Sequence, residues 1–332
     1  MADAVAPAAH RTPRARLAFA LSGRLGFFAV AVVGAVFILQ TLLWSAPGDP
    51  IDMLPLFGQD LEDLRPVLQA EWGLDLPPHE RLWAFITRAL QGDLGESLVI
   101  RKGSPVWDLT WTAWGRSLRV LLPALAISLS GALGLAWLTA GRRSLFIRPA
   151  IQITSILPIF LFVCFLVLWD EYTWTMISER KVTRPEWFPL ADKASPLRYW
   201  LAILVLGLGS NCLTEMHASL ENSLVRIRDS GYVLAARARG AAAWPHVLRN
   251  LLPELVSLAA SRVVMLIGGL VILEKIFNMN GAGALIWRAC LQRDYPLALG
   301  LVLGAALIVS AARLAADTLR LVWDPRAKEA QQ

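Results

Sequence analysis

The sequence is poor in charged residues for its length. Asp, Glu, Lys and Arg make up 17% of the 332 residues, whereas about a quarter is usual in a soluble domain. The deficit is concentrated in long uncharged runs, and 56% of all residues are hydrophobic. Runs of this length indicate membrane spans and argue against a single large soluble core.

Cysteine and histidine are scarce and scattered. No two of the three cysteines form a CxxC pair, and two of them fall within apolar runs: Cys164, Cys212 and Cys290. The four histidines show no metal-ligand spacing. We therefore expect no disulfide framework and no metal site, and interpret the cysteines as packing residues.

Lysine is also rare, which bears on ATP hydrolysis. A phosphate-binding loop needs a Gly-Lys pair followed by Ser or Thr, and none of the five lysines follows a glycine or precedes Ser or Thr. His, Cys and carboxylate residues form no cluster suited to a membrane enzyme. We therefore expect no catalytic activity and no cofactor in this chain, so that any ATP chemistry belongs to another protein.

Six segments are expected to cross a membrane, which predicts an all-α polytopic membrane protein. Residues 25–46 run for 22 residues without a charge, long enough to span at about 1.5 Å per residue. A cleaved signal peptide is the alternative, but its apolar region is normally shorter. The other expected spans are 120–141, 149–169, 199–214, 251–273 and 297–322.

Charge is unequal on the two sides of these spans. The side that holds both termini carries 14 basic and 6 acidic residues, and the opposite loops carry 14 basic and 18 acidic residues. The short loop 142–148 has three arginines and no acid. Because basic loops tend to remain in the cytoplasm, we expect both termini to be cytoplasmic. This distribution also argues against nucleic acid as a partner.

The segments outside the spans have distinct compositions. Residues 1–24 are rich in Ala, Pro and Arg and are expected to form a cytoplasmic tail, as are residues 324–332. The loop 47–116 is too long for a simple connector. It contains helix-like stretches at 61–72 and 80–90, which predict a small helical subdomain on the outer surface.

Carboxylates are nearly absent from the spans. Glu254 directly follows Pro253, so we expect it in the first turn of a helix, where an acid complements the dipole. Asp317 lies four residues after Arg313, and the two are expected to form a structural pair. No carboxylate is left over as an obvious proton relay.

The segment 232–253, between the fourth and fifth expected spans, is the most informative. It is helix-prone at first, breaks at Gly240 and continues as a short helix into the next span. Its alanines would let a partner approach closely, and Arg237 and Arg239 could pair with acids on that partner. The alternative is an ordinary cytoplasmic loop whose arginines reflect only the positive-inside bias.

This segment resembles the EAA loop of permease subunits in bacterial ATP-binding-cassette (ABC) importers. That pattern is an acid, two alanines, three residues, a glycine, nine residues and an apolar stretch ending in Leu-Pro. The acid is missing, because Leu234 stands in its place. The stretch from 235 to 240 is similar to the TARAKG sequence of the peptide branch. The matching residues are Ala235, Ala236, Gly240, Leu252 and Pro253.

Further motifs of the dipeptide, oligopeptide and nickel permeases occur in the same order over roughly residues 25–328. Asn280 replaces a proline of the family pattern. The matching motifs are Pro47-Gly48-Asp49-Pro50, Gly73-Leu74-Asp75 with Pro77, Gly92-Asp93-Leu94-Gly95 with Ser97, Glu274 with Phe277, Gly281 and Gly283, Arg293-Asp294-Tyr295-Pro296, and Asp324-Pro325-Arg326.

The resemblance implies a type I ABC importer permease fold in the bacterial inner membrane. Residues 117–323 would form a five-helix permease core, and 215–250 a cytoplasmic coupling loop. Such a permease pairs with a second homologous permease subunit and with two cytoplasmic ABC ATPase subunits, which carry the ATP and magnesium. An extracytoplasmic solute-binding protein delivers the cargo, which is a peptide, nickel chelate or metallophore. The coupling residues would be Ala235, Ala236, Arg237, Arg239, Gly240, Trp244 and His246.

Arg262 lies near the middle of the fifth expected span, where an unpaired charge costs at least about 2.5–3.5 kcal/mol. One hypothesis is that it faces the transport pathway and attracts an anionic group of the cargo. The other is that it pairs with an acid or a carbonyl of the partner permease.

Two functions of other classes stay open on the sequence alone. A stand-alone secondary transporter would need an inverted internal repeat or coupling acids, and neither is visible. A membrane scaffold or sensor would not need a break at Gly240 followed by Leu252-Pro253 leading into a span.

Overall fold

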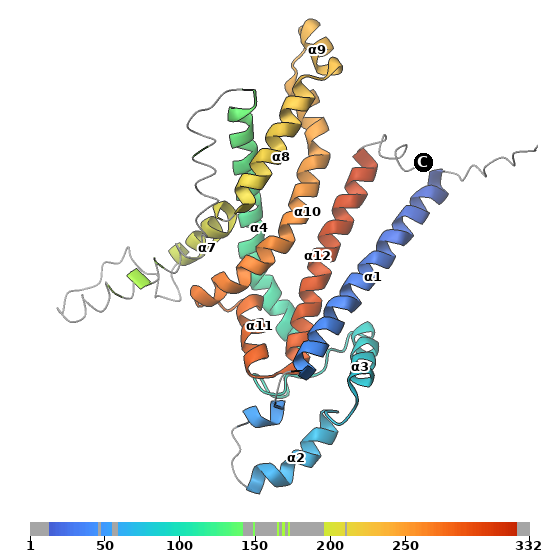
Figure 1. The fold of residues 1–332 in the computed structure, drawn as a ribbon, viewed down its shortest axis with the longest axis vertical. Coiled ribbons are helices and arrows are strands. Elements are labelled where there is room, and N and C mark those ends of the chain that lie inside the picture. The colour runs from blue at the N-terminus through green and yellow to red at the C-terminus, as the bar shows by residue number, and fades with distance from the viewer. Residues whose placement is uncertain are drawn as a thin grey trace, which may run out of the picture.

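In the computed structural model, the described part of the chain is a bundle of long helices without β-strands. A group of short helices, α2 and α3, lies at one end of the bundle, and α9 lies at the other (Figure 1). The structure describes residues 13–45, 48–54, 59–141, 149, 165, 168–169, 172, 196–209 and 211–323.

The helices differ greatly in length. In chain order they are α1 (Pro13–Ser45), the 3-10 helix η1 (Pro50–Met53), α2 (Gln59–Glu71), α3 (Pro78–Leu90), α4 (Val106–Thr139), α7 (Pro196–Leu208), α8 (Asn211–Arg228), α9 (Gly231–Ala238), α10 (Trp244–Ile276), α11 (Ala282–Leu291) and α12 (Tyr295–Trp323).

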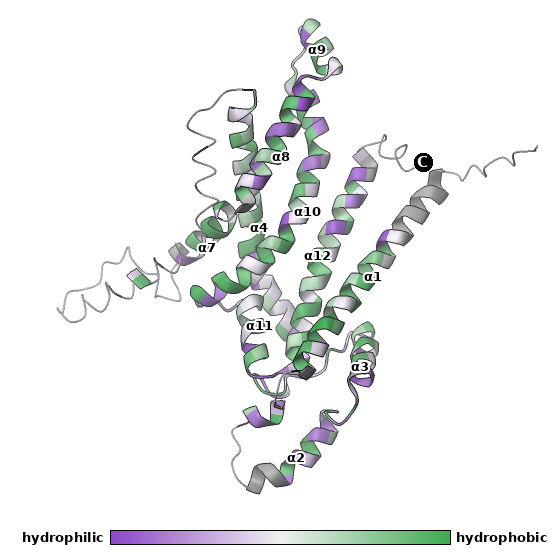
Figure 2. Cartoon of the chain, viewed as in Figure 1, coloured by the Kyte–Doolittle hydropathy of each residue, from purple (hydrophilic) through white to green (hydrophobic). Residues whose placement is uncertain are grey.

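Four of the described helices are long and apolar enough to cross a membrane: α1, α4, α10 and α12. Their hydrophobic residues dominate Figure 2, whereas hydrophilic residues gather in α2 and α8. Helices α7 and α8 pass the same test only as a pair, bent by 50°. The chain is therefore a multi-pass helical membrane protein. The expected third span, 149–169, lies almost wholly outside the described residues.

Two helices begin earlier than the hydrophobic runs predict. Helix α1 starts at Pro13, inside the segment expected to be a tail, and α4 starts at Val106, inside the expected outer loop. Both helices therefore extend beyond the uncharged runs at their starts. The physical reason is that an uncharged run marks contact with lipid, whereas helical backbone bonding continues into water.

Two short helices lie where the sequence predicted helical stretches. Helices α2 and α3 coincide closely with the expected stretches 61–72 and 80–90. Asp52 of η1 accepts a hydrogen bond of 2.9 Å from the backbone N–H of Asp49 and forms an ion pair with Arg65 of α2. The Asp49 hydrogen bond, followed by the Arg65 contact, holds the pKa of the Asp52 carboxyl below its usual range.

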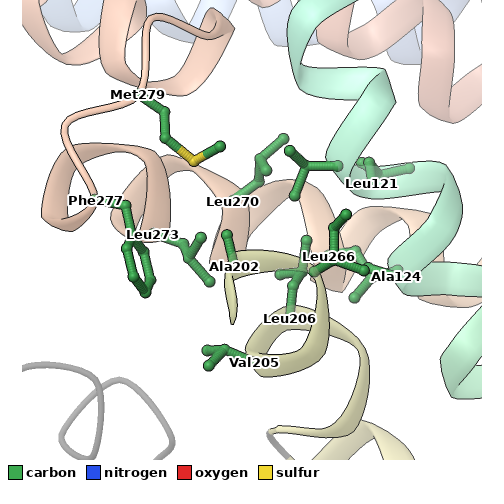
Figure 3. Close-up of a cluster of buried hydrophobic side chains, with 12 residues drawn as sticks. Leu121, Ala124, Ala202, Val205, Leu206, Leu266, Leu270, Leu273, Phe277 and Met279 are labelled. Atoms are coloured by element: carbon green, nitrogen blue, oxygen red, sulfur yellow. The ribbon is translucent and has the colours of Figure 1, made fainter. Parts of the chain in front are cut away.

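The bundle is joined by apolar clusters between neighbouring helices. Helix α4 packs against α7 and α8, α10 packs against α8 and α12, and α12 packs against α1. One cluster joins α4, α7 and α10 through side chains such as Leu121, Leu206 and Leu270 (Figure 3). The carbonyl oxygen of Ala124 lies only 2.7 Å from where a side chain at Gly207 would begin, so glycine permits close contact between α4 and α7.

Candidate functional site

Helix α9 is a short helix with defined ends between α8 and α10. It begins after Ser230 in extended conformation. At its other end Gly240 has φ +74°, a conformation that glycine adopts without strain. The N–H of Ala241 donates to the carbonyl of Ala236 at 3.0 Å, and that of Gly240 to Arg237 at 2.9 Å. This Schellman motif ends α9 and turns the chain toward α10.

One face of α9 is buried against the ends of α8 and α10. Val233 and Ala236 are buried, and Val233 packs with Leu224 of α8 and Val247 of α10. Ala236 thus packs against the chain itself. The remaining six expected coupling residues are exposed: Ala235, Arg237, Arg239, Gly240, Trp244 and His246.

Aromatic contacts at Trp137 of α4 join this helix to the start of α10 and to the end of α8. Trp244 meets Trp137 of α4 edge to face, with ring centroids 4.6 Å apart. The guanidinium of Arg228, at the end of α8, lies 4.2 Å from the Trp137 ring centre and donates to the carbonyl of Ala140 at 3.2 Å. Sequence reasoning missed Trp137 and Arg228, because neither belongs to the family motif.

Arg262 of α10 has a partner that neither sequence hypothesis considered. Its Nη1 lies 2.7 Å from Oε2 of Glu215 on α8, and its side chain is only 11% exposed. Its Nε is buried without a hydrogen-bond partner among the described residues. Glu215 lies at the edge of the fourth expected span. Because it is far from Arg262 in the sequence, the sequence did not indicate this contact.

Glu254 forms a second polar link between α8 and α10. Its Oε1 accepts a hydrogen bond of 2.9 Å from the hydroxyl of Ser219. The expected position in a first helical turn is wrong, because α10 runs without interruption from Trp244 and contains Pro253 in its interior. Proline is tolerated inside membrane helices, where neighbours can satisfy the freed backbone groups.

The expected pair of Arg313 and Asp317 is replaced by a different pair. Oδ2 of Asp317 lies 3.7 Å from Nε of Arg24 on α1. No ion pair involving Arg313 occurs in the described part of the chain. The four-residue spacing allowed the first pairing, but packing of α1 against α12 brings a competing guanidinium to the same carboxylate.

At the opposite end of α10, a buried carboxylate caps α11. Glu274, 1% exposed, accepts hydrogen bonds from the hydroxyl of Ser117 and from the backbone N–H of Ala284 at 3.1 Å. Ser117 in turn accepts from the N–H of Ala282 at 2.7 Å. The carboxylate therefore satisfies the first turn of α11 and complements its dipole.

Asp294 fixes the connection between the outer loop and α12. It is fully buried, and its carboxylate accepts hydrogen bonds from the Ser97 hydroxyl and from the backbone N–H groups of Leu98, Val99 and Ile100. Carboxylates with several backbone donors are held firmly in place. Ser97 and Asp294 lie within or beside family-like motifs, so the sequence marked both without showing that they touch.

No group of three or more His, Cys, Asp or Glu that could hold a metal ion occurs in the part of the chain that the structure describes. What the structure provides is an exposed short helix, seated on the ends of α4, α8 and α10, with polar links from there into the bundle.

Comparison with known proteins agrees with this arrangement. The model of a family described as the binding-protein-dependent transport system inner membrane component matches residues 131–329. A candidate peptide permease of Brucella suis biovar 1 (strain 1330) is 30% identical over 302 residues, covering 88% of this chain and 93% of that protein.

Two further relatives carry more specific names. The oligopeptide transport system permease protein AppB of Bacillus subtilis (strain 168) is 26% identical, covering 89% of this chain and 94% of its own. The glutathione transport system permease protein GsiC of Salmonella typhimurium (strain LT2) is 26% identical, covering 93% and 98%. This chain therefore belongs to the family of binding-protein-dependent transport system inner membrane components.

Proposed function

We propose that this protein is a permease subunit of an ATP-driven importer for peptides or similar small solutes. A nickel chelate or metallophore is the alternative cargo. Three relatives named for peptide, oligopeptide and glutathione transport support this cargo class. The observation that carries the coupling role is the exposed face of α9, which offers arginines with no acidic partner among the described residues.

The proposed docking surface combines charge with small side chains. Arg237 and Arg239 project from the exposed face beside Ala235, so acids of an ATPase could approach the helix closely. Leu234, which replaces the family acid, is 52% exposed and adds an apolar contact to the same face.

Motion of the ATPase would reach the spans through the contacts of α9. The buried face of α9 moves with α8 and α10 because they share one apolar cluster. The edge-to-face contact of Trp137 with Trp244 adds α4 to this unit, and the pair of Arg262 with Glu215 holds α8 and α10 in register. Such a unit favours rigid-body rotation between inward- and outward-facing states.

The proposed assembly contains four further proteins. A second homologous permease would complete the pathway, two ABC ATPase subunits would bind ATP and magnesium, and a solute-binding protein would deliver cargo. With six spans, both termini and the coupling loop would lie in the cytoplasm, where the basic residues concentrate.

The first test is purification of the tagged chain from its native host in mild detergent, followed by mass spectrometry. We expect a second permease and P-loop ATPases to accompany it. Reconstituted in liposomes with its binding protein, the complex should accumulate a labelled oligopeptide only when ATP is supplied. Purification of the chain alone, with transport that needs no ATP, would instead establish a secondary transporter.

The docking surface is tested by reversing its charge. We expect the double substitution Arg237→Glu and Arg239→Glu to lower the recovered ATPase about tenfold or more, since like charges at an interface cost several kcal/mol. Lys102→Glu, an exposed change at the other end of the bundle, is the control and should leave recovery unchanged. Equal recovery with both variants would place the ATPase elsewhere.

A further inference from the structure

A cavity of about 480 Å³ lies between α1, α10 and α12, away from the proposed docking surface. Its lining includes Arg24, the second residue of the apolar stretch of α1, and Arg320, the last residue of that of α12. Because these residues mark where the apolar stretches end, the cavity lies at the depth of the membrane–water boundary. It belongs to the side of the membrane that holds both termini.

The cavity is basic. Three arginines line it against a single acid: Arg24, Arg313, Arg320 and Asp317. Oδ2 of Asp317 lies 3.7 Å from Nε of Arg24. Nε of Arg320 donates a hydrogen bond of 3.3 Å to the carbonyl of Pro253. The lining therefore has more positive charge than the described part of the chain neutralises.

One guanidinium group has an unused donor inside the protein. Nη1 of Arg24 is buried and has no hydrogen-bond partner among the described residues, although an unpaired buried donor is unfavourable, above all on a charged group. Arg313, exposed on α12, makes no ion pair within the described residues. Guanidinium groups with free donors match the oxygens of a phosphate group.

The remaining wall is apolar and continues toward the bilayer. Phe27, Phe28 and Leu314 line the cavity together with the small hydroxyl residues Ser257 and Ser310. Phe27 is 66% exposed and lies in the apolar stretch of α1. A ligand in this cavity contacts arginines with its headgroup and apolar side chains with its hydrocarbon part.

We propose that this cavity binds the phosphate headgroup of an anionic phospholipid. Arg24 and Arg313 hold the phosphate oxygens, Arg320 adds charge at the membrane surface, and an acyl chain lies along Phe27. Basic pockets between membrane helices bind anionic headgroups in this way. A soluble phosphate would gain the same charge contacts, but it would leave the apolar wall unused.

The experiment uses the complete importer complex in nanodiscs made of equal parts of phosphatidylglycerol and phosphatidylethanolamine. After transfer to detergent, native mass spectrometry counts the lipids that remain bound. We expect the wild-type complex to retain phosphatidylglycerol in preference. Arg24→Gln and Arg313→Gln should each reduce this retention about fivefold. A basic residue near the membrane surface changes the affinity for an anionic lipid by roughly this factor.

Two comparisons make the result decisive. Lys102→Gln removes an exposed charge outside the cavity and should retain phosphatidylglycerol like the wild type. Addition of inorganic phosphate should leave the bound lipid in place, whereas displacement by millimolar phosphate would show a soluble-anion site. Equal retention of the two lipids by the wild-type complex would overturn the proposal, whatever the variants do.

Discussion

At the scale of single residues, arginines determine much of how this protein holds together. Arg262 is almost buried against Glu215, Arg24 reaches Asp317, and Arg228 lies over Trp137. In each case a planar guanidinium joins side chains from two different helices. Because an unpaired charge inside a membrane is costly, these contacts restrict which helices can be neighbours.

The pair of Arg262 and Glu215 can be tested with a double-mutant cycle. We expect Arg262→Gln to lower the free energy of unfolding by about 1–2 kcal/mol, because Glu215 is half-exposed and can rehydrate. Glu215→Gln should cost at least as much, since the guanidinium stays buried. The double variant should lower the free energy of unfolding by less than the summed effects of the two single variants. Thermal unfolding in detergent measures all three.

Transport assays on the same variants separate a structural Arg262 from a cargo-binding one. If Arg262 acts through Glu215, both single variants should change the uptake of an acidic and a neutral peptide in equal proportion. A selective loss of acidic peptide with Arg262→Gln, absent from Glu215→Gln, would show that Arg262 contacts the cargo.

At the scale of helical elements, the turn between α10 and α11 is tightly packed around a buried carboxylate. Glu274 lies beneath it, and a side chain at Gly281 would begin 2.0 Å from Oε1 of that carboxylate. At Gly283 it would begin 2.5 Å from the backbone of Val271. Glycine is required at both positions because the capping carboxylate and the α10 backbone occupy the adjacent space.

Gly281→Ala should therefore destabilise the protein by about 1–3 kcal/mol through steric overlap. Gly268→Ala is the matched control, since Gly268 lies within α10 with no neighbouring atom within 4 Å. That change should be neutral or stabilising by up to about 1 kcal/mol, through helix propensity. Thermal unfolding of the two variants measures the contrast, and an equal effect would contradict this account of the turn.

At the scale of the whole molecule, the outer helical group is attached to the bundle by polar contacts. Asp294 binds the 97–100 loop, and Arg293 lies 3.9 Å from Asp52 of η1. The Asp52 carboxylate also pairs with Arg65 of α2. Charge on one carboxylate therefore helps to hold η1 against both α2 and the start of α12.

This attachment should weaken in acid. The pKa of Asp52 is lowered in the folded protein, so its stabilisation is present above the unfolded value near 3.9 and is lost as pH falls through the folded value. Hydrogen exchange of residues 48–54 should be faster in Asp52→Asn than in wild type at pH 6, and the two should converge below about pH 4. Asp75→Asn should match wild type throughout.

The sequence predicted local features far better than neighbours in space. The outer helices, the break at Gly240 and the family motifs depend on residues close together in the chain, where periodicity and turn chemistry are visible. Ala236 belongs to the same motif as the exposed Ala235, and motif membership did not indicate that its side chain is buried.

The contacts Arg262–Glu215 and Arg24–Asp317 join residues 47 and 293 positions apart. In a membrane, hydropathy marks which helices contact lipid, but it does not show which helices pack together. The four-residue spacing of Arg313 and Asp317 offered a local pair, and only the packing of α1 against α12 reveals the competing one.

Because α10 is one uninterrupted helix, it can transmit motion from one end of the bundle to the other. Its 33 residues extend for about 50 Å at 1.5 Å per residue, from Trp244 beside the exposed helix α9 to the capping carboxylate Glu274 at the far end. Tilting a rod of this length by about 10° displaces one end by roughly 9 Å relative to the other. An antibody fragment that clamps the α10–α11 turn from outside should therefore slow ATP hydrolysis on the opposite side of the membrane.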